Sequence, residues 1–164
     1  MAVLEILKAP NDKLKIRAEK VVDVERVQTL IDDMLDTMYA TDDGIGLAAT
    51  QVGRTEAIIV IDISAEKNSP LILINPAVVS GSNKEVGQES CLSVPGYYAD
   101  VERFTTVKVE GLDRNGKEVV VENDDFLAIV LQHEIDHLEG KLFIDYLSPL
   151  KQKIALKKVR KAIR

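Results

Sequence analysis

Cysteine, histidine and tryptophan are scarce in this chain of 164 residues. It has one cysteine, Cys91, two histidines, His133 and His137, and no tryptophan. A single cysteine excludes an internal disulfide, so the thiol is buried apolar filler, a metal ligand or a nucleophile. No apolar run approaches the roughly 18 residues of a membrane-spanning helix, and Glu5 precedes any run long enough for a signal peptide. We therefore expect a cytoplasmic protein with no membrane partner.

Acidic residues are missing from the last 14 positions, although the whole chain carries a net charge of −6. The basic side chains of that tail are Lys151, Lys153, Lys157, Lys158, Arg160, Lys161 and Arg164. An acidic body is a poor generic binder of nucleic acid, so we expect no specific DNA binding, whereas the tail can meet a polyanion locally. A solvated helix face is the alternative interpretation of the same charges.

The rest of the composition is that of an ordinary globular protein, with 46% hydrophobic and 29% charged residues. A chain of this length fits one domain, which we expect to span residues 1–164. From Asp23 to Ala40 the apolar residues recur at three- and four-residue spacing and predict an amphipathic helix with Asp23 as its N-cap. Turn formers follow at residues 41–44, and then a glycine-rich segment at 44–49.

The middle of the chain predicts β-strands at residues 57–63, 71–75, 105–111 and 118–122. Residues 113–116, Asp-Arg-Asn-Gly, are a hairpin turn signal between the last two strands. No crossover of helix length separates the strands, which predicts antiparallel or mixed pairing.

Two further helices are predicted. Residues 124–139 form an apolar helix, capped by Asn123 or Asp124 and closed by Gly140. Its narrow polar seam consists of Asp125, Gln132, Asp136 and Glu139. Ser148 and Pro149 begin a basic C-terminal helix over residues 149–164. The predicted fold class is α+β, with antiparallel or mixed sheets packed around this central buried helix.

His133 and His137 make the central helix a metal-binding candidate. They are four residues apart, so they project from one helix face, and Glu134 follows the first, as in zincin-type metal sites. The alternative is a pair of core histidines with a chance glutamate. A catalytic metal needs three protein ligands and one open position. Glu134 points beside the ligands, which suits a general base or proton shuttle.

The third ligand is not supplied by the usual downstream patterns. Phe143 stands where one zincin pattern has a histidine, and the only acids after His137 are Glu139 and Asp145. Asp145 is a weak candidate. Cys91, upstream, is favoured over it because a thiolate beside a divalent cation is an excellent ligand.

Three segments together resemble the peptide deformylase family: Gly44-Ile45-Gly46-Leu47-Ala48-Ala49-Thr50-Gln51, Glu89-Ser90-Cys91-Leu92-Ser93 and Gln132-His133-Glu134-Ile135-Asp136-His137-Leu138-Glu139-Gly140. The resemblance implies removal of the N-formyl group from N-formylmethionyl nascent peptides, releasing formate. It implies that Cys91, His133 and His137 hold one divalent metal ion, natively Fe²⁺, with Zn²⁺, Ni²⁺ or Co²⁺ in preparations. A water held by the metal would be the nucleophile.

The resemblance also assigns roles to residues that motif chemistry leaves open. Glu134 would be the general acid/base, and the Gln51 amide and the Leu92 N–H would bind the oxyanion, each such donor being worth about 3 kcal/mol. Gly44 and Gly46 would let the backbone approach the peptide. The methionine pocket would consist of Ile45, Phe126, Ile129 and Val130, for which plain core packing is the alternative.

Two positions depart from the family pattern: Ser90 replaces a glycine, and Tyr98 stands where some members have an arginine that contacts the peptide. Glu89 and Arg103 are expected to form a surface ion pair that supports the Cys91 loop, an interaction usually worth little. Two other functions fit the two-histidine helix alone: an HExxH-type metallopeptidase that cuts internal peptide bonds, and a non-catalytic module with a structural metal. The basic tail predicts docking at the ribosome surface.

Overall fold

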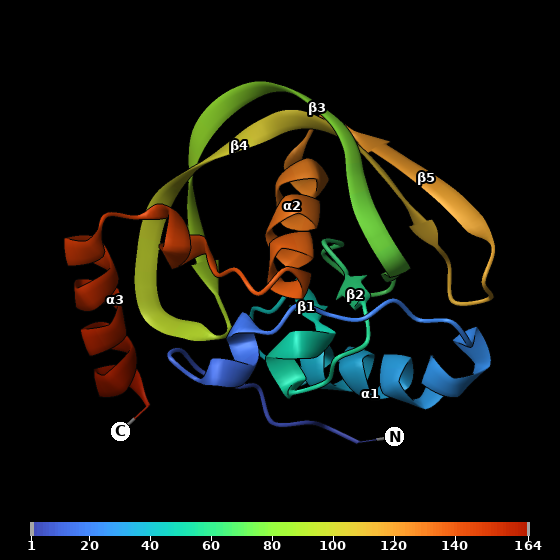
Figure 1. Cartoon of the computed structure of the whole chain (residues 1–164), viewed down its shortest axis with the longest axis horizontal. Coiled ribbons are helices and arrows are strands. Elements are labelled where there is room, and N and C mark those ends of the chain that lie inside the picture. Colours follow the sequence, from blue (N-terminus) through green and yellow to red (C-terminus); the bar gives the residue numbers. More distant parts are fainter. Residues whose placement is uncertain (1, 164) are drawn as a thin grey trace.

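A computed structural model describes residues 2–163; Arg164, counted above with the basic tail, lies outside them. The core of the fold is one sheet of five strands in sequential order, and all of its pairings are antiparallel (Figure 1). The strands are β1 (Gly46–Ala48), β2 (Ile58–Ile61), β3 (Leu71–Cys91), β4 (Val94–Leu112) and β5 (Glu118–Asn123). The helices are α1 (Gln28–Tyr39), α2 (Phe126–Leu138) and α3 (Pro149–Ala162). The predicted α+β class is confirmed, and no helix of the described part is long and apolar enough to cross a membrane.

β2 is buried on both faces. Ile58 and Val60 belong to the apolar cluster around α1, whereas Ile59 and Ile61 pack in the cluster around α2. Successive residues of a strand point to opposite faces, so a strand between two helices must be apolar at every position. The sheet therefore separates α1 from α2, as Figure 1 shows.

α1 matches the later part of the helix predicted between Asp23 and Ala40. A 3₁₀ turn over Val24–Val27 leads into it, and the Asp23 side chain accepts the N–H of Glu25 as a cap. Short 3₁₀ turns also occur at Asp12–Lys15, Ala49–Val52 and Phe143–Tyr146.

β3 and β4 are far longer than the strands predicted from the sequence. Those predictions covered only residues 71–75 of β3 and residues 105–111 of β4. The two strands arch over α2 in Figure 1, and their register shifts at three places, next to Ile74, Val78 and Glu89. Irregularities of this kind bend a strand and increase its twist. Residues 77–88 are exposed, so no alternation of apolar and polar residues marks this part of β3.

α2 begins two residues later than predicted. The Asn123 side chain accepts the N–H groups of Asp125 and Ala128, and Gly140, at φ +79°, closes the helix as expected. In the predicted polar seam, Gln132 is buried and pairs with the backbone of β4. α3 rests on β4 through Ala155 and Val159 and exposes its basic side chains.

Candidate metal centre

Cys91, at the end of β3, and the two histidines of α2 converge on one point. The Cys91 Sγ lies 3.3 Å from the His137 Nε2, which lies 3.3 Å from the His133 Nε2. All three candidate ligand atoms lie within 4.8 Å of one another. An ion about 2.0 Å from each nitrogen and about 2.3 Å from the sulfur, with tetrahedral angles, separates its ligands by a little more than 3 Å. The group therefore fits a metal ion.

Hydrogen bonds fix the orientation of the His133 ring. The His133 Nδ1 donates to the Glu89 Oε1 at 2.9 Å, which leaves the Nε2 lone pair facing Cys91 and His137. Thr50 fixes the last turn of α2 at His137, because the Thr50 hydroxyl donates to the His137 backbone carbonyl at 3.0 Å. An imidazole oriented in this way is prepared for metal binding.

Glu134 lies beside the cluster, in a position that a side chain at residue 46 would crowd. It is 4% exposed, and a Cβ at residue 46 would lie 2.5 Å from its Oε2, so Gly46 makes room for the carboxylate. Burial raises the pKa of Glu134 to about 7. The buried side-chain atoms without a hydrogen-bond partner among residues 2–163 are the Glu134 Oε1 and the His137 Nδ1, and both belong to this site.

Gln51 directs its amide group toward the cluster. Its Oε1 accepts the Ala48 N–H at 2.9 Å, which turns the Nε2 toward Ser93 Oγ at 3.0 Å and Cys91 Sγ at 3.6 Å. The amide is thus held as a donor next to Cys91.

Glu89 and Arg103 form the expected ion pair, but the prediction of a surface location is wrong. Their side chains are 7% and 5% exposed, and Arg103 donates to both Glu89 oxygens at 2.8 and 2.9 Å. Burial by itself raises the pKa of Glu89, but the hydrogen bonds from Arg103 and His133 outweigh it and lower the pKa to about 2. The carboxylate that orients His133 is therefore ionised at neutral pH.

A cavity of about 500 Å³ opens in front of the cluster. Its wall includes all six residues predicted to contact substrate, namely Gly44, Ile45, Gly46, Phe126, Ile129 and Val130, together with Leu92 and Glu134. Ser90 and Tyr98 also line it, so both departures from the family pattern face the same space. Asp145 does not reach the cluster because its carboxylate accepts the Leu142 N–H, and its candidacy as a ligand was wrong.

A family model described as polypeptide deformylase matches residues 3–153. This chain belongs to the peptide deformylase family. Peptide deformylase 2 of Vibrio parahaemolyticus is 69% identical over 164 residues, which cover 100% of this chain and 98% of that protein. The crystal structure of a peptide deformylase from Legionella pneumophila has a TM-score of 0.93 and 45% identity, covering 98% of this chain and 95% of that one. The crystal structure of peptide deformylase from Ehrlichia chaffeensis in complex with actinonin has a TM-score of 0.92 and 41% identity, covering 98% of this chain and 98% of that one.

The prediction of a deformylase is thereby confirmed over that of a metallopeptidase or a structural metal module. The protein is an enzyme with peptide deformylase activity and a Cys-His-His group suited to a metal. Sequence reasoning missed the supporting contacts of Thr50 and Ser93, although both stand inside the quoted motifs. It also missed Asp136, which pairs with Arg103 behind the cluster.

Proposed function

We propose that Cys91, His133 and His137 hold one divalent ion, with Fe²⁺ as the native metal and Zn²⁺, Ni²⁺ or Co²⁺ as replacements. The convergence of their three ligand atoms carries this proposal, together with the position of Cys91 and His133 on the wall of the cavity. Thiolate and imidazole ligands accept all four metals, and availability decides among them. When bound, such an ion lowers the pKa of a water ligand and polarises a carbonyl group.

In this proposal Glu134 moves the proton. Its carboxylate takes a proton from the attacking water and passes it to the amine that leaves as the formyl C–N bond breaks. A pKa near 7 suits both directions of transfer, since a group that titrates near the working pH gives and accepts protons with similar ease. The products are formate and a peptide with a free N-terminus.

Gln51 and Leu92 stabilise the negative charge that develops on the formyl oxygen. The Gln51 Nε2 lies 3.6 Å from the Cys91 Sγ, and Leu92 follows Cys91 directly on the cavity wall. Preorganised N–H donors of this kind each contribute about 3 kcal/mol to a transition state.

The methionine side chain of the substrate occupies the apolar part of the cavity formed by Ile45, Phe126, Ile129 and Val130. The backbone of Gly44 and Gly46 lies along the peptide. Formylated nascent peptides are the substrates that follow, and a cytoplasmic location belongs to the same proposal because such chains emerge from ribosomes there.

A substrate comparison tests the proposal. The protein loaded with Fe²⁺ or Ni²⁺ is incubated with formyl-Met-Ala-Ser, with acetyl-Met-Ala-Ser and with an unformylated decapeptide. We expect formate from the first peptide and negligible cleavage of the others. Cleavage of the decapeptide without formate release from the first would overturn the assignment.

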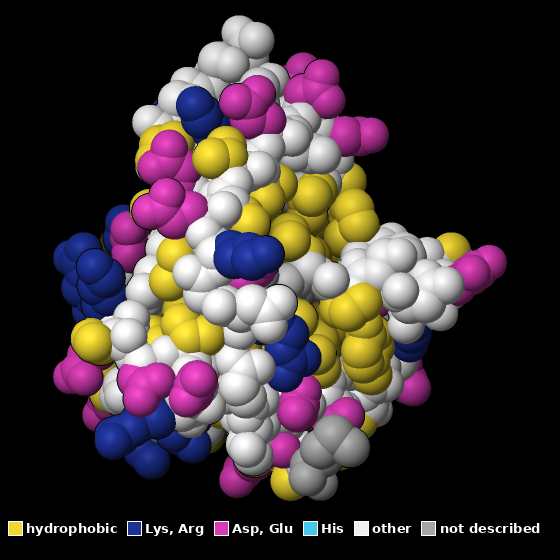
Figure 2. All heavy atoms as spheres, turned by 90° about the vertical axis from the view of Figure 1, so that its right-hand side faces the viewer, with side chains coloured by type: hydrophobic (Ala, Val, Ile, Leu, Met, Phe, Trp, Pro, Cys, Tyr) yellow, Lys and Arg dark blue, Asp and Glu magenta, His cyan; other side chains and the backbone are white. Residues whose placement is uncertain are grey.

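We also propose that α3 docks on ribosomal RNA. Its exposed residues include Lys153, Lys157, Arg160 and Lys161, with no acid among residues 149–163. The opposite end of the molecule mixes acidic and basic side chains around a band of hydrophobic ones (Figure 2). Glutamine at these four positions leaves the packed Ala155 and Val159 in place and should abolish co-sedimentation with ribosomes. Glutamine at Lys13, Lys15 and Lys20 is the control, and unchanged co-sedimentation of the α3 variant would refute the docking.

A further inference from the structure

The hydrogen bond that orients His133 is the inner end of a longer buried network. Two of the three guanidinium nitrogens of Arg103 donate to Glu89, and the third donates to the Asp136 Oδ2. The Tyr146 hydroxyl donates to the same Asp136 oxygen at 2.7 Å. The network therefore runs from Tyr146, at 52% exposed, to a ring that lies in the metal cluster.

This network connects two cavities. Glu89 and His133 line the substrate cavity, whereas Arg103, Asp136 and Tyr146 line a second cavity of about 510 Å³, together with Phe104, Ile135 and Leu138. Arg103 is thus reachable from a space that the substrate does not use.

We propose that Arg103, Asp136 and Tyr146 are positioning residues for the deformylase reaction, which hold His133 in its metal-binding orientation through Glu89. The guanidinium is a planar fork that fits a carboxylate at two points, so it leaves Glu89 a single orientation. Asp136 and Tyr146 fix the guanidinium in turn. With a looser Glu89, the His133 ring samples other rotations, and its Nε2 faces the other two ligands for less of the time. The inference rests on the proposed ligand set.

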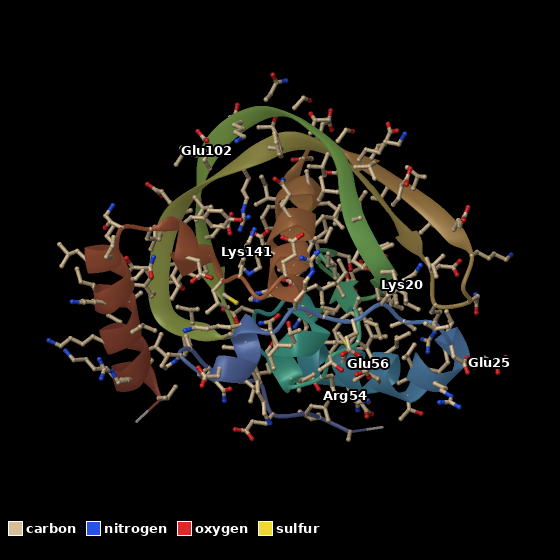
Figure 3. The ribbon with its side chains drawn as sticks, in the orientation of Figure 1. Lys20, Glu25, Arg54, Glu56, Glu102 and Lys141 are labelled. Atoms are coloured by element: carbon tan, nitrogen blue, oxygen red, sulfur yellow. The ribbon has the colours of Figure 1, made fainter. Side chains whose placement is uncertain are left out.

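The chain offers matched controls for both ends of the network. Arg54 and Glu56, labelled in Figure 3, form a similar two-point pair just before β2, but their side chains are 54% and 23% exposed and line neither of the two cavities. Tyr39 donates to the Asp62 carboxylate at 2.6 Å, as Tyr146 does to Asp136. These contacts share the chemistry of the network without its connection to His133.

Metal affinity is the deciding readout. The dissociation constant for Ni²⁺ is measured by competition with a chelator, and the Co²⁺ protein gives an absorption spectrum sensitive to ligand geometry. Loss of a partner that orients a metal-binding histidine typically weakens binding about 10- to 100-fold. We expect this for Arg103→Lys, which keeps the charge but not the fork, and a smaller loss of about threefold for Tyr146→Phe. Arg54→Lys and Tyr39→Phe should bind Ni²⁺ as the unchanged protein does.

Kinetics at saturating metal separate positioning from substrate binding. Arg103→Lys should lower kcat and leave the KM for formyl-Met-Ala-Ser unchanged, because none of the altered groups lies in the apolar part of the substrate cavity. A purely structural role predicts a lower Tm with unchanged metal affinity and an unchanged Co²⁺ spectrum.

Chemical rescue tests access through the second cavity. Arg103→Ala opens a space continuous with that cavity, so added guanidinium should restore part of the Ni²⁺ affinity, whereas urea, a neutral molecule of the same shape, should not. If Arg103→Ala does not fold, Arg103→Lys and Tyr146→Phe decide the matter alone.

His133→Ala distinguishes the two levels of the proposal. If this variant binds Ni²⁺ as well as the unchanged protein does, the ligand set itself is refuted. If it loses the metal while Arg103→Lys and Tyr146→Phe bind Ni²⁺ normally with an unaltered Co²⁺ spectrum, only the positioning role is overturned.

Discussion

The two halves of α2 differ in what they bury. In the C-terminal half, His133, Glu134 and His137 are polar and almost wholly enclosed. In the N-terminal half, Phe126 and Ile129 are apolar and open to the cavity, Phe126 being 52% exposed. Charges act most strongly where water is excluded, whereas an open apolar wall binds apolar groups of many shapes. One helix thus provides the reactive groups at one end and the substrate contact at the other.

Glu134→Gln should have the largest effect, because it removes the proton carrier from the enclosed half while keeping its shape. We expect kcat to fall at least about 1,000-fold, at the upper part of the usual range for a general acid/base. Formate release measures the loss of activity, whereas the metal content and the Tm should remain unchanged. Glu139→Gln, just beyond the same helix, is the control, and equal activity of the two variants would contradict the assignment.

Gln51→Ala should come next. Removing one oxyanion donor costs about 100- to 1,000-fold in kcat. Gln28→Ala is a matched control, since Gln28 also bonds to backbone groups but does not line the cavity. A change confined to KM in Gln51→Ala would assign the amide to substrate binding instead of transition-state stabilisation.

Phe126→Ala tests the open half and should act mainly on KM. Loss of apolar contact with a methionine side chain costs about 1–3 kcal/mol, which is roughly 10- to 100-fold in kcat/KM. Val120→Ala removes a similarly exposed apolar group from β5, outside the cavity, and should leave the kinetics intact. If Phe126→Ala also retains the preference for methionine over alanine peptides, Phe126 does not line the specificity pocket.

The smallest effect is expected for Glu89, which contacts the enclosed half of α2, and it concerns how the free energy of unfolding depends on pH. The pKa of Glu89 is about 2 in the folded protein and 4.5 ordinarily, so its ionised form is favoured by folding. This contribution is complete above about pH 4.5 and is lost as the pH falls toward 2. Urea unfolding at several pH values should therefore show a steeper loss of stability in acid for the unchanged protein than for Glu89→Gln. If the stability of the two proteins falls equally with decreasing pH, Glu89 does not contribute to the acid sensitivity of the fold.

The sequence predicted the elements whose burial leaves a periodic pattern. The helix ending at Tyr39, the apolar strand β2 and the closure of α2 at Gly140 all follow from spacing or turn chemistry. The outer part of β3 could not be predicted because residues 77–88 are exposed and are held by pairing between strands, which leaves no alternation. In the outer part of β4 burial does alternate, but the buried positions include the charged Arg103, so no purely apolar alternation marks the strand.

The site was partly predictable for a related reason. Two histidines four apart define a helix face, but which distant residue completes their group depends on how β3 returns to α2. The burial of the Glu89–Arg103 pair was also hidden, since isolated charge pairs are usually found at the surface. The arch of β3 and β4 encloses the pair together with Asp136 and Tyr146.

An anaerobic Fe²⁺ titration of metal-depleted protein, followed by formate release from formyl-Met-Ala-Ser, tests the central claim most directly. The account predicts that activity rises in proportion to added Fe²⁺ and stops at one ion per chain, and that Cys91→Ser shows no such end point at the same concentrations. Full activity without added metal, or an unchanged titration for Cys91→Ser, would contradict a catalytic site built on Cys91, His133 and His137.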